Sequence, residues 1–405
     1  MKLGVALSNE LRVLDYLERY VNDGSASGFT LHDQLSSKTN PLGMEPFFHP
    51  LSVASEEHEI ERAFSELFEC PDELLDILAH PDAKAELAEV GVSTNRQSSI
   101  RLVPTSSGRT SRILDDRRGY FVKLHYPGVL GRINRSFPEH KALAGIDVSD
   151  EIALAISDGL ITNKIGIMPE VGAAILRTRS PKDFSFAHVV RRLAAYPESE
   201  SCARLPLFSL WSFDRMAPLD KPLIEQMANS DARRTLDISS EIAKSLVDFF
   251  FEAWNSLGYI YEINAQNVLV EIDSRLILRR VILRDFNSTE KDLARRAEIS
   301  RPTTFRSGNY KVLDINDLDT LHIRRSFAFD FKFCNYVVSP LLEALARVDQ
   351  TLAEEFLGSV RDHVADALGR MPVEFFHPNG TWWAHPEMEL TDSRPYVQFS
   401  NPMLR

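Results

Sequence analysis

The sequence predicts an α+β fold in which mixed or antiparallel sheets are followed by a helical C-terminal part. Two strands are expected within residues 268–283, because two apolar runs rich in β-branched residues flank a short polar turn. The preceding residues, 239–257, have apolar side chains at spacings of three and four and stop at Gly258, as a helix does. Residues 341–348 and 352–368 show the same helical spacing.

The N-terminal part is predicted to be mostly helical. Apolar residues recur at helical spacing from Leu11 to Val21 and again from Ile60 to Phe68. Between them lies a Pro-rich loop, residues 41–50, where His49 is a candidate substrate contact, although a loop histidine is more often a packing residue. Residues 160–211 alternate short apolar runs with Gly and Pro, which indicates mixed sheet and loop.

The charge balance narrows the classes of partner. The chain has 58 acidic and 46 basic residues, which give a net charge of -12. Such a protein is not expected to bind nucleic acid or anionic membranes over a general surface, so an anion must be bound at a local basic site. Three scattered cysteines without metal-ligand spacing favour a reducing compartment. No signal peptide or membrane span is expected, so we predict a soluble cytoplasmic protein.

The length of 405 residues predicts two or three subdomains packed against one another. We expect a mostly helical N-terminal subdomain at residues 1–97. Residues 98–235 are expected to carry a phosphate-binding loop. Residues 236–405 are expected to hold the hairpin and the C-terminal helices.

A polar loop in the second subdomain has the composition of a phosphate site. It reads Pro104-Thr-Ser-Ser-Gly-Arg-Thr110, and we expect the strands at 98–103 and 120–125 on either side of it to pair as a hairpin. Its hydroxyls and backbone N–H groups, with Arg109 and the strand residue Lys123, suit a polyphosphate. Taken alone, such a cluster is more often an ordinary turn. Two further arginines follow shortly after and add positive charge, namely Arg132 and Arg135.

The hairpin in the third subdomain carries the matching set of oxygen ligands. The loop before its first strand holds Glu262, Asn264, Gln266 and Asn267, and its second strand leads to Asp285. Mg²⁺ takes one or two protein oxygens and fills its other positions with phosphate and water. Asn267, Asp285 and Glu262 are therefore candidate Mg²⁺ ligands at one half of an ATP site.

Two interpretations of this ATP site follow. Kinase-like phosphotransferases have a catalytic Asp, then an Asn, then a strand pair and a metal-binding Asp, so the hairpin alone fits a small-molecule kinase. In that interpretation Glu262 would replace the usual Asp base. No Gly-rich nucleotide loop precedes Lys123.

The second interpretation uses both halves of the site. Residues 104–110, then Lys123, Arg135, Glu262-Ile-Asn-Ala-Gln-Asn267 and Leu283-Arg-Asp-Phe286 follow one another in the order of a known family. In this combination the chain resembles the siderophore synthetases that work independently of nonribosomal peptide synthetases, the aerobactin-synthetase-like enzymes. The resemblance runs from about residue 98 to the final Asn-Pro-Met-Leu-Arg.

The resemblance implies a hand-shaped fold of thumb, fingers and palm, with a palm distantly like that of kinases. It implies ATP-dependent condensation of a carboxylic acid with an amine or alcohol through an acyl-adenylate, in siderophore or related natural-product biosynthesis. The acid would be citrate-like, another polycarboxylate or an amino acid. A homodimer is also suggested by the resemblance.

The resemblance also implies roles for individual residues. The nucleotide contacts would be Ser107, Arg109, Thr110, Lys123, Arg135, Glu262, Gln266, Asn267 and Asp285. The catalytic group would be Arg109, Lys123 and Asn264. Candidate substrate contacts are His49, Arg132 and Arg284.

The residue types agree with this chemistry. A carboxylate is a poor electrophile, and adenylation makes AMP its leaving group. Charge that builds on the α-phosphate must be neutralised by Arg, Lys and Mg²⁺. Little acid–base machinery is then needed, because positioning of the nucleophile supplies much of the acceleration.

Two features depart from the family pattern. Asn264 stands where the family has His, and a neutral amide cannot carry the charge of a protonated imidazole. The part before the phosphate loop is short, and its His-Pro motif lacks the lysine that follows in the family. A catalytically weakened, ATP-binding partner subunit is therefore a third interpretation.

Overall fold

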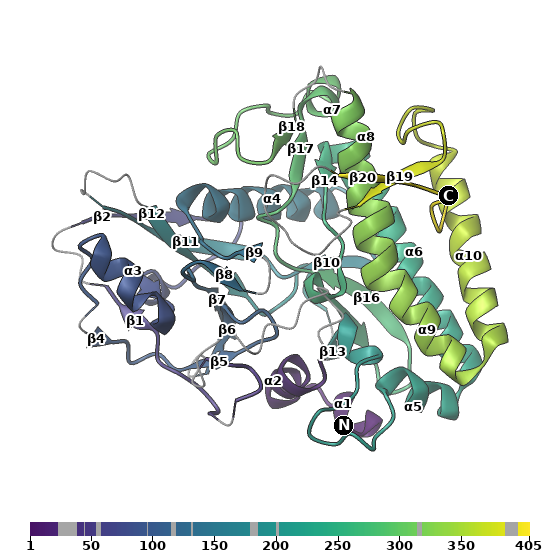
Figure 1. The fold of residues 1–405 in the computed structure, drawn as a ribbon, viewed down its shortest axis with the longest axis horizontal. Helices are drawn as coiled ribbons and strands as arrows, with labels where there is room; N and C mark the ends of the chain where they lie inside the picture. Colours follow the sequence, from purple (N-terminus) through teal and green to yellow (C-terminus); the bar gives the residue numbers. More distant parts are fainter. Residues whose placement is uncertain are drawn as a thin grey trace.

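The computed structural model describes residues 1–22, 39–43, 45–53, 58–94, 96–114, 119–130, 133–178, 185–199, 202–313, 318–384 and 396–405. A large sheet occupies one side of the molecule and a helical layer the other, with a second sheet between them (Figure 1). The predicted α+β fold class, with mixed and antiparallel sheets and a helical C-terminal part, is confirmed.

The large sheet has six antiparallel strands in the order β2-β11-β12-β7-β6-β5. In that order the strands are Glu59–Phe64, Glu170–Arg177, Ser185–Arg192, Tyr120–Lys123, Thr110–Ile113 and Leu102–Pro104. Helix α4 (Glu139–Ser157) covers one face and buries Leu143 and Ile146 against Ile175 and Val189. The other face packs on a small sheet of β3, β1 and β4 (Leu78–Ala79, Leu51–Ser52 and Arg96–Gln97) and on helix α3 (Lys84–Glu89).

The second sheet carries the predicted hairpin. Its order is β10-β16-β15-β13, in which β10 runs parallel to β16 and the other pairs are antiparallel. The strands are Ile165–Ile167, Leu278–Leu283, Val268–Ile272 and Ala203–Pro206. The main hydrophobic core lies between this sheet and helices α6, α9 and α10 (Ala232–Leu257, Ser339–Val348 and Gln350–Leu368).

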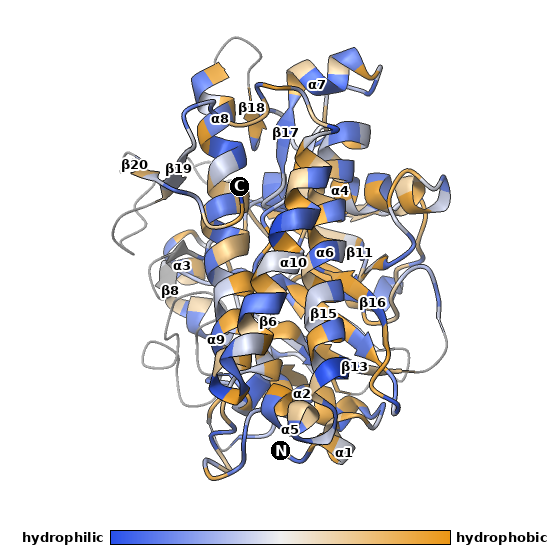
Figure 2. Cartoon of the chain, turned by 90° about the vertical axis from the view of Figure 1, so that its right-hand side faces the viewer, coloured by the Kyte–Doolittle hydropathy of each residue, from blue (hydrophilic) through white to orange (hydrophobic). Residues whose placement is uncertain are grey.

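Helix α6 shows how local sequence defines these elements. Asp231 begins it as the N-cap, because its carboxylate accepts a hydrogen bond from Arg234 N at 2.9 Å. Gly258 ends it in the left-handed conformation with φ +66°. One face of the helix is buried and the other is polar, as Figure 2 shows for the helical side of the molecule.

The remaining elements connect these layers. Helices α1, α2, α5, α7 and α8 span Leu3–Ala6, Leu11–Tyr20, Leu223–Ser230, Leu293–Glu298 and Leu318–Ser326. Strands β8, β9, β14, β17, β18, β19 and β20 span Val129–Leu130, Ile133–Asn134, Tyr259–Ile260, Glu290–Asp292, Val312–Leu313, Thr381–Ala384 and Val397–Ser400. A π-helix covers Phe327–Val338, and the 3₁₀ helices are Asp72–Leu74, Pro81–Ala83, Leu207–Leu210 and Ala265–Asn267.

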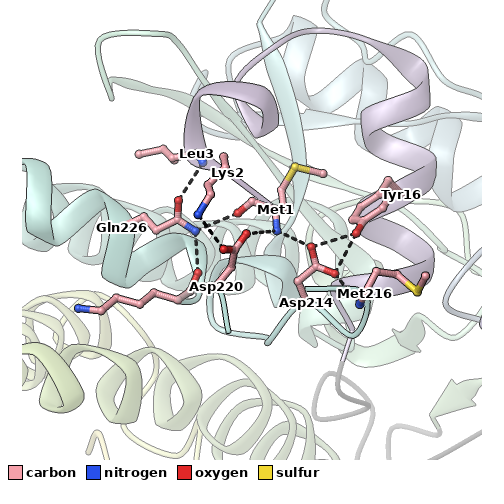
Figure 3. A network of polar contacts seen from close by, with 9 residues as sticks. Met1, Lys2, Leu3, Tyr16, Asp214, Met216, Asp220 and Gln226 are labelled. Atoms are coloured by element: carbon pink, nitrogen blue, oxygen red, sulfur yellow. Dashed lines mark hydrogen bonds and ion pairs between the residues drawn. The ribbon is translucent and has the colours of Figure 1, made fainter. Parts of the chain in front are cut away.

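A polar network fastens the first two helices to the loop before α5 (Figure 3). Both carboxylate oxygens of Asp214 lie 3.0 Å from the Tyr16 hydroxyl, and Asp220 accepts from Lys2 Nζ at 2.7 Å. Gln226 on α5 accepts a hydrogen bond from the backbone N–H of Leu3. These contacts hold the N-terminal helices against the second sheet and α5.

Most predicted helices are confirmed, including the one at residues 11–21. The described residues between 160 and 211 form sheet and loop as expected, apart from the 3₁₀ helix at Leu207–Leu210. The helix predicted at 60–68 is wrong, because residues 59–64 form strand β2 at the sheet edge. Arg177 on the neighbouring strand lies opposite Glu59 and forms ion pairs with Glu59 and Glu61. Tertiary pairing thus overrides the helical spacing.

The strand pairing around the phosphate loop also differs from the prediction. The strands at 98–103 and 120–125 were expected to be direct partners, but β6 lies between β5 and β7. The chain reverses within residues 105–109, where Gly108 has φ +74°, so the loop itself is the turn of the β5–β6 hairpin. The division at residues 97 and 235 stays a prediction.

Candidate active site

The second-sheet hairpin places Asn267 and Asp285 at the same end. Val268 and Leu283 are partners in the ladder, so the residue before β15 and the residues after β16 emerge together. Arg284 N donates to Asn267 O at 3.0 Å. Asp285 itself has φ +74°, an uncommon conformation for a residue other than glycine and one that is frequent at functional sites.

The predicted phosphate loop, residues 104–110, is held in shape by hydrogen bonds of its own hydroxyl groups. Thr105 Oγ1 donates to Thr110 O at 2.7 Å, and the Ser107 hydroxyl accepts from Thr110 N at 2.8 Å. Thr110 is the ladder partner of Lys123 on β7. Arg109, the last loop residue before β6, therefore lies next to the strand residue that pairs with Lys123.

The loop and the hairpin meet through Lys123. Its ammonium group donates hydrogen bonds to the Asp285 carboxylate and, at 2.7 Å, to Asn287 Oδ1. Lys123 and Asp285 are separated by 162 residues in sequence. The structure thus brings together the two halves of the site that the sequence proposed.

Several buried arginines surround this ion pair. Arg191 Nη2 lies 2.8 Å from Glu170 Oε1 and 3.7 Å from Asp285 Oδ1. Arg109 donates to the backbone carbonyl of Arg135. Arg135 Nε is buried without a hydrogen-bond partner within the described residues.

A second group of ion pairs adjoins the first. Glu262 accepts from Lys332 Nζ at 2.8 Å, and Glu290 accepts from Arg324 at 2.8 Å and pairs with Lys311 at 3.5 Å. In the described part of the chain the two groups together hold seven cations and four carboxylates. The cations are Arg109, Lys123, Arg135, Arg191, Lys311, Arg324 and Lys332, and the carboxylates are Glu170, Glu262, Asp285 and Glu290.

The pKa values of Lys123, Arg109 and Asp285 are shifted by burial and by the neighbouring charges. Burial, with Arg109 and Arg191 nearby, lowers the pKa of Lys123 to about 7, although Asp285 opposes the shift. Burial and the neighbouring Arg135 lower the pKa of Arg109 to about 9. Burial alone would raise the pKa of Asp285, but Lys123 and Arg191 hold it below its ordinary value. Asp285 is therefore ionised, and the site has an excess of desolvated positive charge.

Comparisons of the sequence with known proteins found no matching family model and no matching curated protein. Solved structures do match. The petrobactin biosynthesis protein AsbB from Bacillus anthracis str. Sterne has a TM-score of 0.72 at 13% identity, over 96% of this chain and 74% of that one. ATP-bound aerobactin synthetase IucA from a hypervirulent pathotype of Klebsiella pneumoniae has a TM-score of 0.67 at 15% identity, over 92% and 73%. Aerobactin synthetase IucC from the same pathotype has a TM-score of 0.63 at 12% identity, over 98% and 81%.

The chain has the fold of these siderophore synthetases. The family resemblance seen in the sequence is thereby confirmed at the level of the fold. At these identities the likeness does not extend to substrates or to the role of any residue.

Two further predicted site residues, Asn264 and Arg284, have side chains that are hydrogen-bonded within the protein. Asn264 Oδ1 accepts from Gln266 N at 3.1 Å and from Asn267 N at 3.2 Å, so it caps the 3₁₀ helix that carries both residues. Arg284 donates to Gln266 O at 2.9 Å and pairs with Glu18 at 2.6 Å. The contact with Glu18 links the hairpin of β15 and β16 to helix α2.

The other predicted substrate contacts are less closely linked to the ion pairs. His49 Nδ1 lies 3.0 Å from the carbonyl oxygens of Ser98 and Ile100, which hold the His49 ring against the chain before β5. Arg132 lies outside the described residues. The roles assigned to both residues stay predictions.

Sequence reasoning missed several members of the site. Arg191 and Glu170 lie on strands of the large sheet, where charged residues inside buried strands are the available signal. Asn287 follows Asp285 by two positions and could have been found from the hairpin. Lys311, Arg324 and Lys332 come from separate elements and have no shared sequence pattern.

The residues of this cluster are suited to binding a nucleoside triphosphate. Buried cations in excess, two of which (Arg135 and Arg191) have an Nε without a hydrogen-bond partner among the described residues, would be stabilised by a polyphosphate. No group of three His, Cys, Asp or Glu side chains within the described ranges could hold a metal unaided. A phosphate-bound Mg²⁺ needs one or two protein oxygens, and Asn267 and Asp285 fit that requirement. Glu262, like Asp285, is already paired with a lysine, in its case Lys332, and its part as a metal ligand stays a prediction.

No helix in the described part of the chain is long and apolar enough to cross a bilayer.

Proposed function

We propose that this chain is an ATP-dependent, AMP-forming ligase that joins a carboxylic acid to an amine or alcohol through an acyl-adenylate. We place it in siderophore or related metallophore biosynthesis, in agreement with the fold it shares with petrobactin and aerobactin biosynthesis proteins. The observation that carries the proposal is the contact between Lys123 and Asp285 within a buried, cation-rich cluster. Single acidic or basic clusters are common, but this one joins both predicted halves of an ATP site.

The residues would divide the work as follows. Arg109, Lys123 and Arg135 would bind the phosphates and neutralise the charge that develops on the α-phosphate. Ser107 and Thr110 hold the loop so that its N–H groups can add to this binding. When bound, Mg²⁺ would be held by Asn267 and Asp285 and would help to neutralise the charge of the phosphates.

The proposed reaction has two steps. The acid carboxylate attacks the α-phosphorus of ATP and pyrophosphate leaves. The amine or alcohol then attacks the activated carbonyl, loses a proton and releases AMP. The protein excludes water from the buried cluster and positions the two reactants, and both effects favour the second step over hydrolysis.

Product analysis tests the proposal directly. Protein, Mg²⁺, ATP and a panel of carboxylic acids, including citrate, would be incubated with hydroxylamine as a general nucleophile. We expect AMP, pyrophosphate and a hydroxamate with at least one acid. ADP and a phosphorylated small molecule would instead identify a kinase, the alternative that the hairpin alone supports.

A binding subunit without catalysis is the remaining alternative. It would bind Mg-ATP in calorimetry yet form no hydroxamate with any acid. Absence of ATP binding would reject the ATP site itself. We further propose a cytoplasmic homodimer, which light scattering on the purified protein would test.

A further inference from the structure

One aromatic ring lies beside two of the cations of the proposed phosphate site. The ring centroid of Phe137 is 5.2 Å from Arg109 Cζ and 5.2 Å from Lys123 Nζ. The Phe137 side chain is fully buried, so water does not reach the ring. Cation–π attraction is strongest under such desolvated conditions.

The position of the ring is fixed by its backbone. Phe137 N donates to His125 Nδ1 at 3.0 Å, and Phe137 O accepts from Ala187 N at 2.7 Å. The other nitrogen of His125 lies 2.7 Å from Glu86 Oε2 on α3. The ring itself packs between α4 and the large sheet, so it cannot move away from the cations without disturbing both.

The segment that carries Phe137 also fixes Arg109. The backbone carbonyl of Arg135, two residues earlier, accepts the hydrogen bond from the Arg109 guanidinium. Arg109 and Lys123 are both cationic and both buried. Their mutual repulsion adds to the free-energy cost of burying each of them. A ring that offers its negative face to both cations offsets part of that repulsion.

We propose that Phe137 is a positioning residue, whose ring holds the Arg109 guanidinium and the Lys123 ammonium together in the orientation that receives the phosphates. The inference rests on the proposed ATP site. It extends that site by a residue that touches no ligand and acts through the two cations.

The test changes the electrostatics of the ring without changing its size. Phe137 would be replaced by phenylalanines with one, two and three ring fluorines, which progressively remove the negative face. Mg-ATP affinity would be measured by calorimetry, and thermal unfolding would be followed in parallel. Phe137→Leu would remove the ring altogether. Phe356 is the matched control, because it is equally buried in helix α10 and has no cation beside its ring among the described residues.

We expect the Kd for Mg-ATP to rise in steps with fluorination and by about tenfold in Phe137→Leu. Phe356→Leu should lower the melting temperature, and none of the changes at Phe356 should alter the Kd.

A Kd that stays constant across the Phe137 fluorination series would overturn the inference while leaving the ATP site intact. A wild-type protein that binds no Mg-ATP would instead overturn the proposed function. The two failures are therefore distinguishable in the same experiment.

Discussion

At the scale of single residues, Arg109 and Asp285 carry the two halves of the proposed ATP site. Arg109→Ala and Asp285→Ala should each lower the rate of adenylation by about a hundredfold or more, because each removes a charge from a buried site where developing charge must be balanced. The rate would be measured as acid-dependent pyrophosphate release. Arg233→Ala changes an exposed arginine outside this cluster and serves as the control. Wild-type turnover in either variant would remove that residue from the site.

Asn264 has a structural task that its departure from the family histidine did not suggest. Its amide oxygen caps the short helix bearing Gln266 and Asn267. Asn264→Ala should lose a cap contact of ~1 kcal/mol and raise the KM for ATP several-fold, whereas Asn264→Ser keeps an uncharged acceptor and should stay near wild type. Steady-state kinetics would check this. Equal KM values for the two variants would mean that the cap does not position Asn267.

Asn264→His would restore the residue and the positive charge that stand at this position in the family pattern. In the structure the side chain is committed to two backbone N–H groups, so the substitution exchanges a cap for a charge. We therefore expect Asn264→His to give no higher activity with a citrate-like acid unless the histidine also caps the 3₁₀ helix.

Lys123 gives the site a predictable pH dependence. Its pKa is lowered to about 7 by burial, and a bound phosphate would raise it again. Below pH 7 the lysine is already protonated, so few protons are taken up when ATP binds. Above pH 7 binding must protonate it, and affinity should fall as pH rises.

Calorimetry in buffers of different ionisation enthalpy measures this proton uptake. Wild-type protein at pH 8 should take up most of one proton more than Lys123→Arg under the same conditions, because arginine stays protonated. The comparison cancels the protons of ATP itself. Identical uptake in both proteins would show that Lys123 is already charged at pH 8.

At the scale of elements, the end of helix α6 sets the start of the hairpin. Gly258 has φ +66°, and a Cβ there would lie 2.5 Å from Arg296 Cγ. Arg296 in turn donates to the carbonyl of Leu257 at 2.7 Å. Gly258→Ala should therefore lower the free energy of unfolding by about 2–3 kcal/mol, from the left-handed backbone and the close contact together.

Gly369 at the end of helix α10 is the matched control. Its backbone is right-handed, and an added Cβ would meet ordinary contacts at 3.5 Å or more. Gly369→Ala should be neutral or stabilise by up to about 1 kcal/mol. Chemical denaturation of both variants would measure the difference. Equal losses would mean that backbone conformation is not what Gly258 supplies.

At the scale of the whole molecule, the nucleotide would join segments from both sheets. Loop 105–110 belongs to the six-stranded sheet and Asp285 to the hairpin of the second sheet. Mg-ATP at a hundred times its Kd should therefore raise stability by about 2.7 kcal/mol. A thermal shift would show this in the wild type and not in Lys123→Ala. A full shift in that variant would place the nucleotide elsewhere.

Helices and the hairpin could be predicted because their signals are local. The apolar face, N-cap and terminal glycine of α6 act within a few residues of one another, and residues 268–283 pair with each other across a short turn. The residue types of the proposed ATP site were likewise visible in order along the chain. The sequence by itself therefore determined these elements and the residue types that the proposed site would use.

The tertiary structure decided what depends on residues far apart in the chain. It made residues 59–64 an edge strand, because β11 supplies their hydrogen bonds and Arg177 their counter-charge. It also brought Lys123 and Arg191 of the large sheet to Asp285 of the hairpin. Such buried ion pairs are settled by burial and mutual neutralisation between distant parts of the chain, and no local pattern encodes them.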